Sequence, residues 1–160
     1  MSLYSIDKLI EETRRLAAEF KRTTGAMLPV TAELARYDVA RHLNLILNEQ
    51  RTGGYDATGT REREGLRVQI KGRVVGDSIK SGHRIGQLNT DADWDLVILS
   101  LMDENFEPFE MYQATRAEIL QAMTDPASSR GKRGAVSIAK FRIIGELVWT
   151  RENGLEKLSG

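Results

Sequence analysis

The sequence predicts a mixed α/β domain, and three stretches support that prediction. From Leu3 to Arg22, apolar residues recur at helical spacing, which is typical of an amphipathic helix. Residues Leu66 to Val75 alternate between apolar and polar side chains, which is the period of a β-strand. The run from Trp94 to Leu101 is almost continuously apolar, as in a strand buried on both faces. We therefore expect helices packed on a sheet with these two strands at its centre.

The composition fits one globular domain. The length of 160 residues suits a single domain spanning residues 1–160, with a core of about residues 30–116 and a C-terminal extension of residues 117–160. The chain has no cysteine, which excludes disulfides and thiolate metal sites. No apolar run reaches the length of a membrane span, and the N-terminus lacks an apolar signal core. We therefore expect a cytoplasmic protein without a membrane partner.

The charges are balanced in number but segregated along the chain. The net charge is zero, yet residues 61–84 hold seven basic and three acidic residues, whereas residues 91–118 hold one basic and eight acidic residues. A basic patch is what a phosphate-contacting surface needs. The alternative is that residues 61–84 are charged only because they are exposed.

Before the alternating strand, we expect a second helix and a short strand. Apolar residues recur at helical spacing from Thr31 to about Leu43. Glu33 falls in the first turn of this helix, where the positive helix N-terminus favours a carboxylate. The segment Leu45 to Glu49 is expected to be a first strand.

The stretch from Gly53 to Arg73 predicts a β-hairpin. Tyr55 to Thr58 is short and strand-like, and the polar segment Gly59 to Gly65 is bounded by glycines, as turns are. The alternating strand then returns along the first one.

Polar side chains converge on one face of this hairpin. If the turn is centred between Glu62 and Arg63, Asp56 lies directly opposite Gln69, and such cross-strand neighbours are about 5 Å apart. Lys71 follows two residues after Gln69, so it lies on the same face. A carboxylate, an amide and an amine are therefore expected in one small patch.

After the hairpin, the polar segment Gly76 to Thr90 is expected to form a short helix or a loop. Pro108 to Gln113 is expected to pair antiparallel with the apolar run, because the link between them is short. Thr115 to Met123 predicts a helix that begins with a capping box of Thr115 and Glu118.

The C-terminal part is less regular. Asp125 to Gly134 is polar and rich in glycine and serine, which indicates a loop. Phe141 to Trp149 forms either a last strand or a helix, and its β-branched and aromatic residues favour the strand. Arg151 to Gly160 is expected to be a frayed tail.

Asp56 followed by Gln69-Ile70-Lys71 resembles the motif of the PD-(D/E)XK nuclease superfamily, whose fold is called restriction-endonuclease-like. The resemblance covers roughly residues 30–116. It departs at Gly54-Tyr55, where the superfamily name has Pro-Asp, and at Gln69, which replaces an acidic residue. It implies an αβββαβ core with a central mixed sheet flanked by helices, to which the N-terminal helix is added.

The resemblance also implies a nuclease: an Mg²⁺- or Mn²⁺-dependent phosphodiesterase acting on DNA, the favoured partner, or on RNA. Glu33, Asp56 and Gln69 would hold the metal, and Lys71 would complete the catalytic set by orienting or deprotonating water. The expected nucleic-acid contacts are basic residues of the hairpin and two loops: Arg73, Lys80, His83, Arg84, Arg130, Lys132 and Arg133.

Alternatives remain open at this stage. The helix dipole alone can explain Glu33, and a cross-strand ion pair with Asp56 can explain Lys71. Because Gln69 removes an acid and the net charge is zero, the chain is alternatively a non-catalytic nucleic-acid- or protein-binding module of the same fold. A weaker alternative is a helical DNA-binding regulator built on the first two helices. A homodimer is compatible with each of these.

Overall fold

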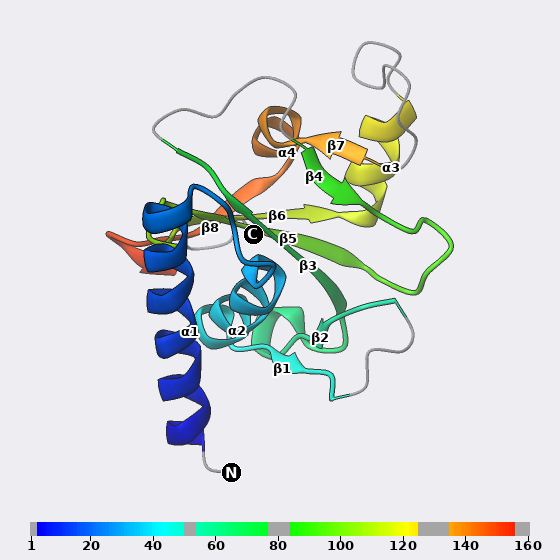
Figure 1. Ribbon diagram of the computed structural model, residues 1–160. Helices are drawn as coiled ribbons and strands as arrows, with labels where there is room; N and C mark the ends of the chain where they lie inside the picture. Colours follow the sequence, from blue (N-terminus) through cyan, green and yellow to red (C-terminus); the bar gives the residue numbers. More distant parts are fainter. Residues whose placement is uncertain (1–2, 50–53, 77–83, 125–134, 156–160) are drawn as a thin grey trace.

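Seven strands form the central sheet of the computed structural model, which describes residues 3–49, 54–76, 84–124 and 135–155 (Figure 1). In spatial order, they are β1 (Ile46–Leu47), β2 (Ala57–Thr58), β3 (Arg67–Val74), β5 (Leu96–Met102), β6 (Pro108–Thr115), β8 (Glu146–Thr150) and β9 (Gly154–Leu155). β3 and β5 are parallel, and the other neighbouring pairs are antiparallel. The predicted mixed sheet, with β3 and β5 at its centre, is confirmed.

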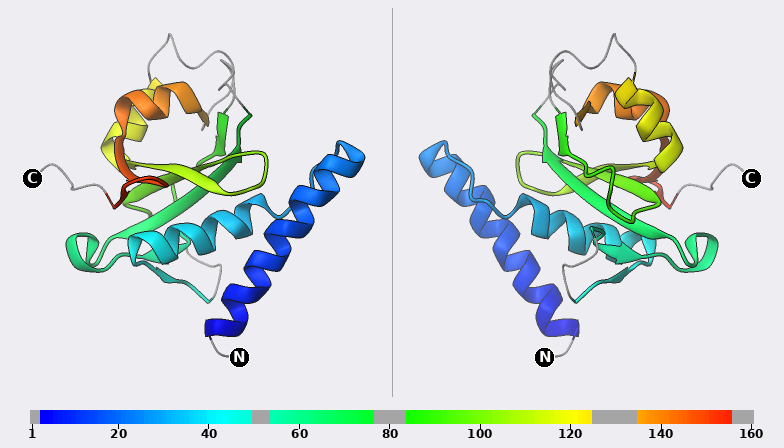
Figure 2. Two further views of the ribbon diagram at one scale, coloured as in Figure 1. Left: turned by 90° about the vertical axis from the view of Figure 1, so that its left-hand side faces the viewer. Right: turned by 90° about the vertical axis from the view of Figure 1, so that its right-hand side faces the viewer.

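Helices cover both faces of this sheet (Figure 2). Leu34 and Ala35, from the helix that precedes β1, pack with Val68 and Ile70 of β3 on one face. The opposite face carries two further helices and a small two-stranded sheet. The first face is covered by α1 (Leu3–Thr24) and α2 (Thr31–Leu43), the second by α3 (Arg116–Thr124), α4 (Ile138–Ile144), β4 (Arg84–Gln87) and β7 (Ala135–Ser137). Within the described ranges, no helix combines the length and apolarity needed to cross a membrane.

β5 holds the layers together because all seven of its residues are buried. Leu96 and Ile98 belong to the core under α1 and α2, whereas Val97 and Leu99 belong to the core under α3 and α4. The alternation of side chains along a strand explains this division. The prediction of a strand buried on both faces is confirmed.

The β2–β3 hairpin has the predicted register. Ala57 pairs with Val68 and Thr58 with Arg67, so the hairpin is centred between Glu62 and Arg63. The turn is not a simple one, because it contains a short 3₁₀-helix at Arg61–Arg63. The Arg63 side chain is buried there and donates from Nε to Oε1 of Gln113 on β6 at 2.6 Å, which fixes the turn against the sheet.

The prediction of one strand over residues 141–149 is wrong in its first half. α4 ends at Ile144, and only the residues after Gly145 enter β8. The hydroxyl of Ser137 accepts a hydrogen bond from the backbone N–H of Lys140, which caps the helix. Phe141 is fully buried and Ile143 is 78% exposed, so the apolar content reflects one buried helix face and one exposed residue.

Two other segments also differ from expectation. Among the described residues between β3 and β5, the chain forms β4, with Ile85 buried against the sheet, and not a helix or an irregular loop. The expected frayed tail begins with an ordered segment, because β9 pairs with β8. The capping box of α3 is confirmed: Thr115 and Glu118 exchange side-chain to backbone hydrogen bonds of 2.9 and 3.2 Å.

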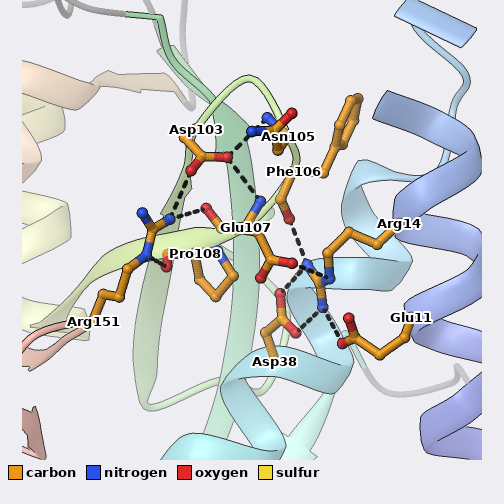
Figure 3. Close-up of polar contacts among 9 residues, drawn as sticks. All are labelled: Glu11, Arg14, Asp38, Asp103, Asn105, Phe106, Glu107, Pro108 and Arg151. Atoms are coloured by element: carbon orange, nitrogen blue, oxygen red, sulfur yellow. Dashed lines mark hydrogen bonds and ion pairs between the residues drawn. The ribbon is translucent and has the colours of Figure 1, made fainter. Parts of the chain in front are cut away.

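A buried ion pair fastens α1 to the rest of the domain (Figure 3). The Arg14 guanidinium donates to both carboxylate oxygens of Asp38 on α2, at 2.5 and 3.0 Å, and also to the carbonyl oxygen of Phe106. Burial opposes the charged form of Arg14, but the hydrogen bonds and charge of Asp38 raise its pKa above the ordinary value. One side chain thus joins α1, α2 and the β5–β6 turn.

Replacing Arg14 by Met should destabilise the protein by about 3–5 kcal/mol, because Asp38 would stay buried without its partner. Arg15 is the matched control, since it pairs with Glu12 on the exposed side of the same helix. Urea unfolding of Arg14→Met and Arg15→Met measures the difference. Equal midpoints for the two variants would show that Arg14 does not anchor α1.

α2 approaches β3 more closely than a side chain would allow. A Cβ atom at Gly72 would lie 2.5 Å from the Cβ of Ala35 and 3.0 Å from the Cε of Met102. Glycine therefore sets the distance between the helix and the strand.

Gly72→Ala should destabilise the protein by about 1–3 kcal/mol, because helix and strand must move apart to admit the methyl group. Gly76→Ala is the control, since its Cβ would meet only the Glu104 side chain, at an ordinary 3.4 Å. Thermal unfolding of the two variants tests this. A Gly72→Ala protein as stable as the control would mean that the contact is not tight.

Candidate active site

Asp56 closes the ladder between β2 and β3. Its backbone N–H donates to Val68 at 2.8 Å, and its carbonyl accepts from the N–H of Asn48 at 2.9 Å. Its carboxylate oxygen Oδ2 accepts from the N–H of Ile70 at 2.7 Å. The side chain thus takes the place that a strand carbonyl would occupy if β2 continued, which fixes the carboxylate at the edge of β3.

A single arginine links the two predicted carboxylate ligands. Arg36, one turn after Glu33 on α2, donates from Nη1 to Glu33 Oε2 at 3.1 Å. Its Nε lies 3.4 Å from Oδ1 of Asp56. Its Nη2 reaches the carbonyl oxygen of Asn48 at 3.3 Å. The carboxylates of Glu33 and Asp56 therefore approach each other with a guanidinium between them.

Gln69 and Lys71 stand on the opposite face of β3 from α2. Alternation along β3 places Val68 and Ile70 in the core under α2, and Gln69 and Lys71 on the other side. Within the described residues, the printed contacts join Glu33 to Asp56 through Arg36, and none joins Glu33 to Gln69 or Lys71.

Lys71 is partly buried beneath β4. Its Nζ donates to the carbonyl oxygen of Gln87 at 3.0 Å, so its amine is hydrogen-bonded to β4 and not to Asp56. Burial lowers the pKa of Lys71; the charge of Asp56 opposes that shift, and the charge of Arg73 adds to it. The amine is therefore closer to its neutral form than an ordinary lysine.

Arg73 lies beside Lys71 under the same strand. It donates from Nε to the carbonyl oxygen of Arg84 at 2.8 Å and from Nη1 to that of Gly72 at 2.7 Å. Burial lowers the pKa of Arg73 as well. Gly86 has a φ of +96°, and a Cβ there would lie 2.7 Å from Nη2 of Arg73, so glycine lets β4 cross these side chains.

The predicted nucleic-acid contacts are only partly described. Arg73 and Arg84 lie together at the crossing of β3 and β4, and Nη1 of Arg84 is buried without a hydrogen-bond partner among the described residues. The other five predicted contacts lie outside the described residues: Lys80, His83, Arg130, Lys132 and Arg133.

The donors available at this site suit a hard divalent cation. In the described part of the chain, no three His, Cys, Asp or Glu residues gather as a metal-binding group. Glu33 and Asp56 are two carboxylates, and Mg²⁺ is commonly held by one or two carboxylates together with waters. The Arg36 guanidinium already provides a positive charge between them. The pair therefore fits a cation, with Gln69 as a further oxygen donor near Asp56 in register.

Sequence reasoning missed Arg36 and Asn48. Arg36 had the pattern of an exposed helix charge, but it is 8% exposed and bonded to the site. The signal that could have found it is its i,i+3 spacing from Glu33, the spacing of helical ion pairs. Asn48 gave no signal, because its contacts with Tyr55 and Asp56 depend on how β1 pairs.

No protein-family model matches this chain, and no curated protein is significantly similar to it.

Titration of Lys71 tests the electrostatics of the site. NMR of protein labelled at the lysine side chains should give a midpoint for Lys71 below that of an ordinary lysine, because burial disfavours the ammonium. In Asp56→Asn the midpoint should fall further, since the charge that favours the ammonium is removed. In Glu64→Gln, a change in the exposed turn, it should not move.

The sign of the linked stability change follows from the same shift. With the native pKa of Lys71 depressed, the unfolded state binds the proton more tightly, so this group's destabilising contribution is relieved as the pH rises through the native and then the unfolded pKa. A Lys71 midpoint at or above the ordinary value would contradict both expectations.

Proposed function

We propose that this chain is a metal-dependent phosphodiesterase that acts on nucleic acid, with a restriction-endonuclease-like core. The order of elements supports the core: α2 precedes the antiparallel strands β1, β2 and β3, and β5 then pairs parallel to β3. The observation that supports the function most is the hairpin itself. It fixes the Asp56 carboxylate at the edge of β3, two residues in register from a partly buried Lys71 with a lowered pKa.

When bound, a divalent ion would supply charge neutralisation and a more acidic water. Glu33 and Asp56 are the residues that would hold it, with the Gln69 amide as a neutral donor. The remaining tasks belong to the strand. Lys71 can accept or orient a proton of the attacking water, because its lowered pKa brings the neutral amine closer to working pH.

The substrate class follows from the cations beside this lysine. Arg73 and Lys71 are hydrogen-bonded to backbone carbonyls of β4 and not to carboxylates. Their charges therefore remain available to attract a phosphate group, which arginine binds well. We propose DNA as the substrate, since a polymer of phosphates suits a patch that continues along β3 toward Arg84.

A second candidate function is a non-catalytic binding module of the same fold. One observation favours it: Arg36 already pairs with both Glu33 and Asp56. If that arginine never leaves, the carboxylates cannot hold a metal, and only phosphate binding by the β3 cations would remain.

The proposed activity predicts cleavage of DNA by the purified protein with Mg²⁺ or Mn²⁺ and none with EDTA. Lys71→Met should reduce cleavage by at least about a hundredfold, the scale of general acid–base catalysis, while DNA binding persists. Lys8→Met, in exposed α1, is the control and should cleave normally.

The result distinguishes the two candidates. Binding that weakens with salt but is never accompanied by cleavage would favour the binding module. Cleavage that survives EDTA, or a Lys71→Met protein as active as the parent, would overturn the metal-dependent proposal.

A further inference from the structure

We infer that Arg36 is a resident counter-cation that holds the two carboxylates of the site together in the metal-free protein and must withdraw before a divalent ion binds. This inference rests on the proposed function, because it concerns how the same site admits its metal. It assigns Arg36 a positioning role that its place among the charged residues of a helix does not suggest.

The geometry of the guanidinium supports this role. Arg36 presents Nη1 to Glu33 at 3.1 Å and Nε to Asp56 at 3.4 Å, so two different nitrogens serve two carboxylates. Its side chain is 10% exposed, which removes most of the water that would screen these charges. A buried arginine placed in this way performs the electrostatic task of a bound cation.

A divalent ion and this guanidinium compete for the same oxygens. Both need a lone pair of Glu33 and one of Asp56, and two cations within a few ångströms repel one another in a partly buried site. Oδ2 of Asp56 is already taken by the N–H of Ile70 at 2.7 Å. Oδ1 is therefore the oxygen that Arg36 and the metal must share or exchange.

The structure also provides a second anchor for the displaced side chain. Nη2 of Arg36 contacts the carbonyl oxygen of Asn48 at 3.3 Å. Asn48 is itself fixed, because its amide donates to the carbonyl of Tyr55 at 3.1 Å and its N–H to that of Asp56. Arg36 can therefore turn away from the carboxylates and keep one hydrogen bond.

Substitution of Arg36 tests the inference by metal binding alone. Mn²⁺ is titrated calorimetrically into the wild type, Arg36→Met and Arg41→Met, the last being an exposed arginine on the same helix. Arg36→Met should bind Mn²⁺ about tenfold more tightly, because two competing ion pairs are removed. Arg41→Met should match the wild type, and Asp56→Asn should lose most of the binding.

A measurement on the wild type avoids reliance on a variant that fails to fold. The Nε–Hε signal of Arg36 in NMR should shift as diamagnetic Mg²⁺ is added, and the signal of Arg41 should not. Arg36→Lys provides a further check: a lysine keeps the charge but cannot reach both carboxylates with separate nitrogens, so its Mn²⁺ affinity should lie between the other two.

The outcomes separate this inference from the proposed function. If the wild type binds Mn²⁺ and Arg36→Met binds it equally or more weakly, the counter-cation role is wrong and the metal site stands. If neither protein binds Mn²⁺ and the Arg36 signal stays fixed, both the inference and the metal-dependent activity are overturned.

Discussion

The close contact between α2 and β3 is the constraint on which the candidate site depends. Because Gly72 has no side chain, Ala35 can pack directly against the strand. That contact brings the first turn of α2 near the end of the β2–β3 ladder, where Arg36 reaches Asp56. A helix held farther away would leave Glu33 and Asp56 as two separate surface carboxylates, and no cation could bridge them.

Charge balance in the site is unusual because cations outnumber the carboxylates. Arg36, Lys71 and Arg73 are all partly or largely buried around Asp56 and Glu33. The protein satisfies the two β3 cations with backbone carbonyls of β4, which compensate their burial without neutralising their charge. This arrangement favours anions on the β4 side of the sheet and a counter-cation on the α2 side.

The sequence predicted those parts of the fold that depend on local patterns. The alternation of β3, the apolar run of β5, the register of the hairpin and the capping box of α3 each follow from neighbouring residues. The division of residues 138–150 into α4 and β8 did not, because Phe141 and Trp149 suit either structure until their burial is known. In the site, the opposition of Asp56 and Gln69 was predictable from the period of two, whereas Arg36 depends on how closely α2 packs.

The pairing of β3 with β5 has a consequence for the order in which the protein folds. All the proposed ligands lie between Glu33 and Lys71, a stretch whose strands pair only with sequence neighbours and whose loops are cheap to close. Yet β2 contributes only two residues to its ladder with β3. The hairpin therefore gains its rigidity from the far edge of β3, where β5 arrives after a long excursion of the chain. The site is written in one local segment, but its geometry is completed late, when that non-local strand docks.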